Sequence, residues 1–81
     1  MQVWVAMTKR SGGMGFDYRA VSNLEKAMTI VEDFATEVGV DVEGDEVDAG
    51  FDPDSERVIW FSGDGEDGPE ARIEGPLEVE A

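Results

Sequence analysis

Carboxylates are the side chains through which this sequence is best equipped to do chemistry or to make specific contacts. Two acidic groups lie in its second half: Asp41, Glu43, Asp45, Glu46 and Asp48, and then Asp64, Glu66, Asp67 and Glu70. Carboxylates two residues apart on a strand lie about 6.5–7 Å from each other on one face. Such a row presents regularly spaced negative charge, as a nucleic-acid backbone does. Because like charges this close lower stability, the pattern predicts that these acids contact a partner.

Catalysis is not expected of these carboxylates. The sequence contains no His and no Cys, which removes the commonest general base, the thiolate nucleophile and most zinc chemistry. None of its serines has an evident base beside it, and a chain of 81 residues leaves little room for a substrate cleft around a tuned carboxylate pair. We therefore predict that the protein is not an enzyme and has no catalytic residues.

Two segments are similar to ligand-binding motifs but depart from them at the decisive positions. A D-x-D-x-E motif begins at Asp52, as in a calcium loop, which requires Gly at its sixth position and Glu at its twelfth. Those positions hold Arg57 and Gly63. The glycine-rich segment 9–15 lacks the Gly-Lys-Ser/Thr ending of a phosphate-binding loop. The sequence therefore predicts no metal and no cofactor.

The charge is distributed unevenly along the chain. The 20 acidic and 6 basic residues give a net charge of −14. Residues 1–31 contain two acids and four bases, a net charge of +2, whereas residues 32–81 contain 18 acids and two bases, a net charge of −16. Such a chain repels nucleic acids and anionic membranes. The expected partner is a basic protein surface, such as that of a nucleic-acid-binding protein, with neither direct nucleic-acid nor membrane binding.

The first half of the sequence predicts two strands and a helix. Gln2–Thr8 alternates with apolar residues on both faces, as in a central strand, and Phe16–Ala20 forms a hairpin with it across the glycine-rich loop. Ser22 and Glu25 have the spacing of a capping box. Apolar residues at 3.6-residue spacing then continue the helix to about Val38, before a glycine cap.

The second half predicts short strands separated by turns. The expected strands are Val40–Glu43, Glu46–Phe51, Arg57–Ser62 and Ala71–Glu80. Arg57–Ser62 is apolar on both faces and should be central, and the turn before it contains Pro53 at the position that a type I turn favours. Gly75-Pro76 interrupts the last strand, which places that strand at a sheet edge, where an N–H group needs no partner.

These elements predict an α+β fold formed by a single domain over residues 1–81: one antiparallel sheet of four to five strands with a single helix packed on one face. One helix covers only one face, yet Trp4, Ile59 and Trp60 help to place apolar side chains on both. The other face must be closed by strong curling, by a second copy or by a partner. No segment has the length of a membrane span or of a signal-peptide core, so a cytoplasmic location is expected.

The small size, the acidic excess, the lack of Cys and His and the expected strand–strand–helix–strand core resemble small phage-encoded inhibitors, among them DNA-mimicking anti-CRISPR and anti-restriction proteins. The resemblance covers the whole chain through composition and architecture. It implies a stoichiometric inhibitor, acting in the host cytoplasm, that docks its acids onto a Lys- and Arg-lined channel. Lys9 and Arg10 depart from an all-acidic mimic. The alternative is a salt-adapted structural or housekeeping domain from a halophile, as a monomer or a homodimer.

Overall fold

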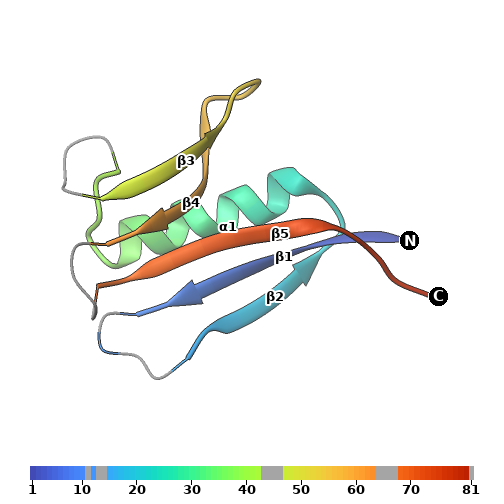
Figure 1. Cartoon of the computed structure of the whole chain (residues 1–81), viewed down its shortest axis with the longest axis horizontal. Coiled ribbons are helices and arrows are strands. Elements are labelled where there is room, and N and C mark those ends of the chain that lie inside the picture. Colours follow the sequence, from blue (N-terminus) through green and yellow to red (C-terminus); the bar gives the residue numbers. More distant parts are fainter. Residues whose placement is uncertain (11, 13–14, 43–46, 64–67, 81) are drawn as a thin grey trace.

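The computed structural model describes residues 1–10, 12, 15–42, 47–63 and 68–80, which form one sheet and one helix (Figure 1). The elements in chain order are β1 (Gln2–Lys9), β2 (Asp17–Val21), α1 (Leu24–Glu37), β3 (Asp48–Asp52), β4 (Arg57–Ser62) and β5 (Glu70–Glu78). All strand pairs are antiparallel, and the order across the sheet is β2-β1-β5-β4-β3. The predicted fold class is confirmed.

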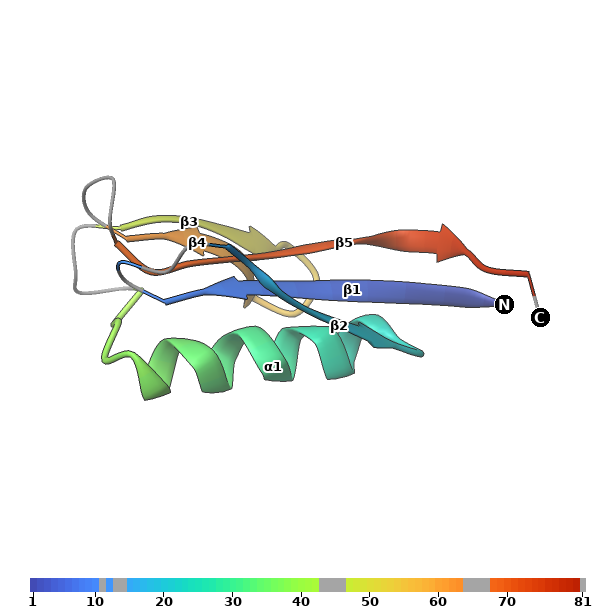
Figure 2. The same cartoon turned by 90° about the horizontal axis from the view of Figure 1, so that it is seen from below.

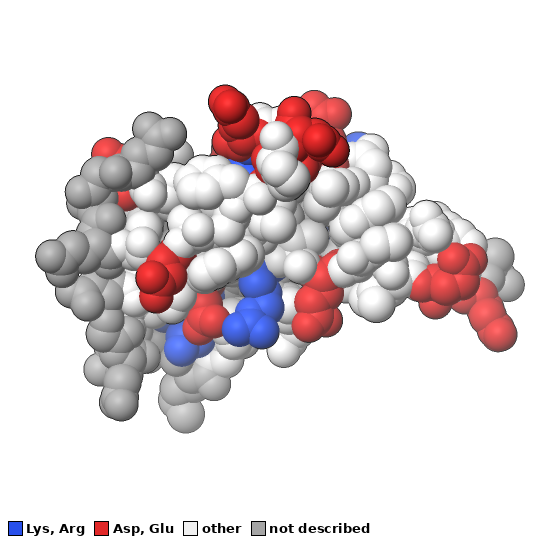
Figure 3. Space-filling view, turned by 45° about the horizontal axis from the view of Figure 1, so that its top comes forward, with Lys and Arg blue, Asp and Glu red and all other residues white. Residues whose placement is uncertain are grey.

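The molecule has two layers, because α1 covers one face of the sheet and leaves the other face open (Figure 2). The strand order makes β2 and β3 the two edges, so the described strands do not close into a barrel. Viewed obliquely from the open side, the surface shows a broad uncharged area bordered by acidic and basic side chains (Figure 3). Curling therefore does not close this face.

The last strand differs from its prediction: β5 lies at the centre of the sheet, between β1 and β4. Pro76 is tolerated there because β5 pairs with β4 only over residues 70–72. On the β1 side, the proline lies at an irregularity in the register, between the partners of Val3 and Val5. Gly75 is required beside it, since a Cβ at this position would lie 2.7 Å from the Trp4 ring.

The helix begins one residue later than the predicted capping box. The N-cap is Asn23, whose side-chain oxygen accepts a hydrogen bond from the Lys26 amide at 2.8 Å, so the assignment of Ser22 as the cap is wrong. Asn is at least as good an N-cap as Ser, and this frame leaves Glu25 in the first turn, where the helix dipole favours an acid.

The helix ends as predicted, with Gly39 just after the C-cap Val38 in a left-handed conformation, at a φ of 75°. The Gly39 amide donates to the Thr36 carbonyl at 3.2 Å, and the Val40 amide donates to the Ala35 carbonyl at 2.8 Å. These two bonds form a Schellman motif, in which glycine avoids the steric cost that a Cβ meets at positive φ.

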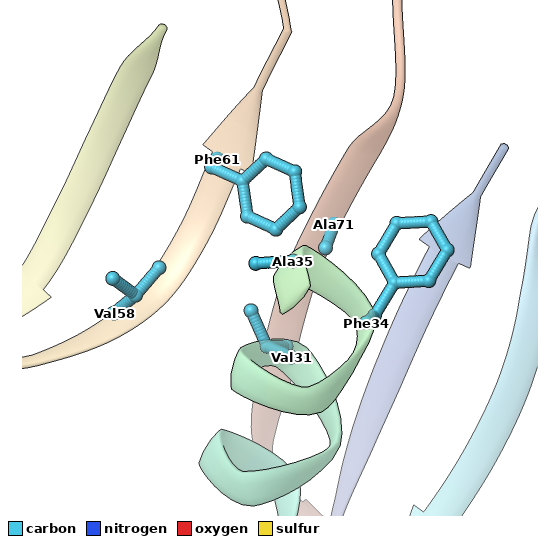
Figure 4. Close-up of a cluster of buried hydrophobic side chains, with 6 residues drawn as sticks. All are labelled: Val31, Phe34, Ala35, Val58, Phe61 and Ala71. Atoms are coloured by element: carbon cyan, nitrogen blue, oxygen red, sulfur yellow. The ribbon is translucent and has the colours of Figure 1, made fainter. Parts of the chain in front are cut away.

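The core lies between α1 and the three strands β1, β5 and β4 (Figure 4). Its main cluster contains Val31, Phe34, Ala35, Val58, Phe61 and Ala71. Phe61 is fully buried, and its ring stacks on Phe34 with 6.0 Å between the centroids. Phe51, on β3, lies on the helix side but keeps 43% of its surface exposed.

Candidate functional site: the acidic margin of the sheet

The strand order converts the charge difference along the sequence into a charge difference across the sheet. β1 and β2, from the near-neutral part of the chain, form one side, and β3 and β4, from the acidic part, form the other. Asp48, Asp52, Asp54 and Glu56 follow one another along β3 and its turn into β4, and we call these four residues the acidic margin. Figure 3 shows acidic side chains gathered over this turn.

Three of the nine predicted site residues are described, and two of them lie close together. Asp48 and Glu70 are both register partners of Ser62, one on each side of it. Two strand spacings separate their backbones by about 10 Å, and the pairing places both side chains on the open face. The other predicted residues lie outside the described parts of the chain: Glu43, Asp45, Glu46, Asp64, Glu66 and Asp67.

Asp41 lies apart from this pair, because the strand predicted over residues 40–43 does not form in its described part, 40–42. The Val40 amide is used by the helix cap, and Val40 and Val42 pack against the core cluster. Asp41 instead lines a surface pocket of about 280 Å³ on the helix side, together with Glu56 and Arg57. The alternating carboxylate row therefore does not extend as a strand through Asp41.

Three acids outside the predicted site residues belong to the margin. Asp54 and Glu56 are exposed, while the Asp52 carboxylate holds the turn by accepting from the Asp54 amide at 3.0 Å and the Ser55 hydroxyl at 2.8 Å. Glu56 has a φ of 57°, which closes the turn. The D-x-D-x-E motif was the available signal: it marks an acidic turn, and the strand order brings that turn to the same side as Asp48.

The cation nearest to this margin is held by the helix. Arg57, at the start of β4, donates to both carboxylate oxygens of Glu32 at 3.1 Å, and Glu25 lies 3.5 Å from its guanidinium. The hydrogen bonds that Arg57 donates to Glu32 raise the pKa of Arg57, against the opposing effect of burial. This arginine ties β4 to α1, and its charge is balanced within the molecule.

Arg72, on β5, is the other cation of the acidic part of the chain. It donates to Glu70 at 2.9 Å, and its guanidinium lies 5.8 Å from the centre of the Phe16 ring. Both arginines beyond residue 31 are therefore engaged in intramolecular contacts. The acidic margin keeps its negative charge, since none of its four carboxylates takes part in these pairs.

On the opposite side of the sheet, acids and bases are mixed. Arg10 contacts Glu37 in the last turn of α1, where no basic residue of the helix itself offsets the acids. A pocket of about 300 Å³ between β2 and α1 is lined by both signs of charge, including Arg19 and Asp33. Of the two cations in the glycine-rich loop, Arg10 therefore compensates helix acids, and Lys9 lies over the Phe16 ring.

The described residues contain neither a metal cluster nor a membrane-spanning helix. They bring together no group of three or more potential metal ligands. Within the same residues, no helix has the length and apolarity needed to cross a bilayer. Comparison of the chain with protein-family models, with curated proteins and with solved structures finds no match. The fold and the site therefore define only the class of protein: a small acidic α+β protein with one charged margin and one open sheet face.

Proposed function

We propose that this chain is a non-enzymatic binding protein whose acidic side mimics a nucleic-acid backbone and occupies the basic groove of a nucleic-acid-binding protein. One observation carries the proposal. The acids beyond residue 31 far outnumber their cations, and both of those cations, Arg57 and Arg72, already have carboxylate partners in the same chain. The surface along β3 therefore offers carboxylates without competing positive charge.

The geometry of the margin supports this function. Asp48 and Asp52 stand at the two ends of β3, an edge strand, so their side chains are accessible from outside the sheet. Two further carboxylates continue the series through the turn. A line of anionic groups along one edge is complementary to Lys and Arg side chains lining a groove, and this complementarity speeds association and selects the partner.

Two matched triple variants test the proposal. The first carries Asp45→Asn, Glu46→Gln and Asp48→Asn and removes three negative charges at the predicted site. The second carries Asp17→Asn, Asp33→Asn and Glu80→Gln and removes three negative charges elsewhere. Because both variants have the same net charge, a difference between them reports position and not total charge.

The probe is a labelled DNA duplex bound to each of a panel of purified bacterial nucleases and nucleoid proteins, followed by fluorescence anisotropy. We expect the wild-type protein to displace the duplex from at least one of them. The site variant should compete at least about tenfold less well, and the control within about twofold of wild type, with displacement weakening as salt is added. No displacement from any protein, or equal losses in both variants, would refute directional mimicry.

A second candidate function follows from acids that lie away from the margin. Glu25, Asp33 and Glu37 occupy the outer side of α1, and Glu80 follows β5. Figure 3 likewise shows acidic side chains at several separate places around the surface. This distribution suits a domain adapted to a salt-rich cytoplasm, in which carboxylates hydrate the surface and need no partner.

The two candidates differ in how salt affects the free protein. A salt-adapted domain reaches full stability only when its self-repulsion is screened, at salt concentrations on the order of 1 M. Its melting temperature should then rise steeply between low salt and that range. A melting temperature that barely changes would exclude salt adaptation, while leaving the displacement experiment to decide on mimicry.

A further inference from the structure

The open face of the sheet carries apolar side chains that the described chain covers only in part: Met7 is 7% exposed, whereas the others keep more of their surface accessible. The register places them on one face across four strands: Val3, Val5 and Met7 on β1, Tyr18 on β2, Trp60 on β4 and Leu77 on β5. Tyr18, Trp60 and Leu77 keep 69%, 40% and 42% of their surface exposed. Exposed aromatic and aliphatic groups gathered on one face mark a surface that another molecule buries.

The Trp60 indole is held in one position on the open face by its contact with Gly50 on the neighbouring strand. Its register partner on β3 is Gly50, and a Cβ at that glycine would lie only 1.7 Å from the indole nitrogen. The indole therefore lies flat across the glycine, over the sheet. A large ring that is already ordered loses little entropy on binding, which is why tryptophan is so frequent among the residues that dominate interfaces.

The charges at the centre of this face, on β1 and β5, balance each other, whereas Asp48 on β3 adds a negative charge at its edge. Across β1 and β5, Lys9 and Arg72 share it with Glu70 and Glu74. The chain as a whole has a net charge of −14. The centre of the open face therefore adds no net charge repulsion between two copies that approach through it.

Arg72 and Glu74 also make the face complementary to itself. They lie two residues apart on the central strand, so both side chains point to the open side. Glu74 forms no ion pair within the described residues, and Arg72 uses one nitrogen for Glu70. A two-fold axis that runs parallel to the sheet, across the strands at Ile73, brings Arg72 of each copy opposite the partner's Glu74.

We propose that the protein forms a homodimer in which the open faces of two sheets pack against each other around this axis. The partner is a second copy, because an isologous interface requires a surface that complements itself in shape and charge. The dimensions suffice: the molecule is 39 by 31 Å across and 17 Å thick, and a standard interface covers about 800 Å² per partner. The result is a four-layer assembly with the helices outside.

Analytical ultracentrifugation of the wild-type chain over a range of protein and salt concentrations gives the first test. We expect a monomer–dimer equilibrium that shifts toward dimer as salt rises, because screening reduces the repulsion between two acidic chains. Binding of a basic partner responds to salt in the opposite sense. A chain that stays monomeric at all concentrations and salt levels would overturn the dimer without touching the proposed function.

A charge-swap series tests the geometry. Arg72→Glu places like charges opposite each other and should weaken dimerisation at least about tenfold. Adding Glu74→Arg restores opposite charges and should recover most of the affinity. If the double variant dimerises no better than the single one, the proposed axis is wrong.

Apolar truncations provide a matched pair with no charge change. Trp60→Ala should weaken the dimer at least about tenfold, because it removes the largest aromatic side chain of the face, which is 40% exposed. Phe51→Ala removes a side chain of similar exposure that points to the helix side, and it should leave the dimer unchanged. Far-UV circular dichroism checks that each variant is folded. Equal effects of the two truncations would contradict the assignment of the interface to the open face.

Discussion

Phe61 offers the sharpest test of how the helix is held on the sheet. It has no exposed surface, stacks on Phe34 across the helix–sheet boundary and packs in the cluster that includes Val31 and Val58. Replacing it by Ala removes the ring and leaves a cavity, and substitutions of this kind cost about 3–5 kcal/mol. We therefore expect the free energy of unfolding of Phe61→Ala to fall by that amount.

The consequence is large because the domain is small. At about 0.05–0.15 kcal/mol per residue, 81 residues give a free energy of unfolding of about 4–12 kcal/mol. The substitution removes a quarter of this value at the least and all of it at the most. For a domain of this size each kcal/mol shifts the melting temperature by about 4–8 °C, so Phe61→Ala should melt at least about 12 °C lower or be unfolded at room temperature.

Urea titration at fixed ionic strength, followed by far-UV circular dichroism, measures the difference. Phe51→Ala is the control, since Phe51 is 43% exposed and its truncation should cost about 1–1.7 kcal/mol, less than that of Phe61. If the two variants lost equal stability, Phe61 would not lie between α1 and the sheet.

Three further substitutions test local features. Asn23→Ala should lower the free energy of unfolding by about 1 kcal/mol, because it removes the N-cap, whereas Ser22→Ala should lower it by less than about 0.5 kcal/mol. Urea titrations that rank the two variants the other way would refute the observed N-cap. Gly39→Ala should cost about 1 kcal/mol in the same assay, because its φ of 75° is unfavourable for Ala, and an unchanged midpoint would contradict the Schellman motif. Gly50→Ala should displace the Trp60 indole, with altered near-UV circular dichroism and an unchanged far-UV spectrum; identical near-UV spectra would show that the indole does not cover the glycine.

The elements that the sequence predicts well are those encoded by local patterns. Apolar spacing and Gly39 locate the helix, because the 3.6-residue period and the need for positive φ act within one segment. The β1–β2 hairpin and the apolar character of β4 are also visible locally. Ser22 and Asn23 are both good caps, and only the packing of α1 on the sheet selects the frame.

The position of β5 could not be predicted, because it depends on pairing between distant segments. Gly75-Pro76 has the composition of an edge strand, and nothing local shows that β4 pairs with only the first residues of β5. The strand predicted over residues 40–43 is wrong in its described part, 40–42, for a similar reason. Their alternation of apolar and acidic residues is typical of a strand. However, the Val40 amide donates its hydrogen bond to the end of the helix, and the Val40 and Val42 side chains pack against the core cluster.

The candidate site shows the same division. That Asp48 belongs to an acidic group is visible in the sequence, whereas its position about 10 Å from Glu70 follows only from the strand order. The turn acids Asp54 and Glu56 join the margin for the same reason. The open face was expected from apolar residues on both sides of the strands. That Arg72 and Glu74 lie near the middle of this face could not be predicted, because it depends on the central position of β5.

The central position of β5 also links the acidic margin to the proposed dimer. A two-fold axis that runs across the strands places β3 of one copy over β3 of the other, so both acidic margins lie on the same side of the assembly. Their mutual repulsion opposes dimerisation, and a basic partner that spans both margins removes it. Partner binding and dimerisation should therefore strengthen each other, since linkage between two equilibria is reciprocal. The variant with Asp45, Glu46 and Asp48 neutralised should then dimerise more tightly than wild type at low salt while binding the basic partner less well. Loss of folding does not produce this combination. The control variant at Asp17, Asp33 and Glu80 has the same net charge and should show both effects more weakly, and equal effects in the two variants would contradict the link.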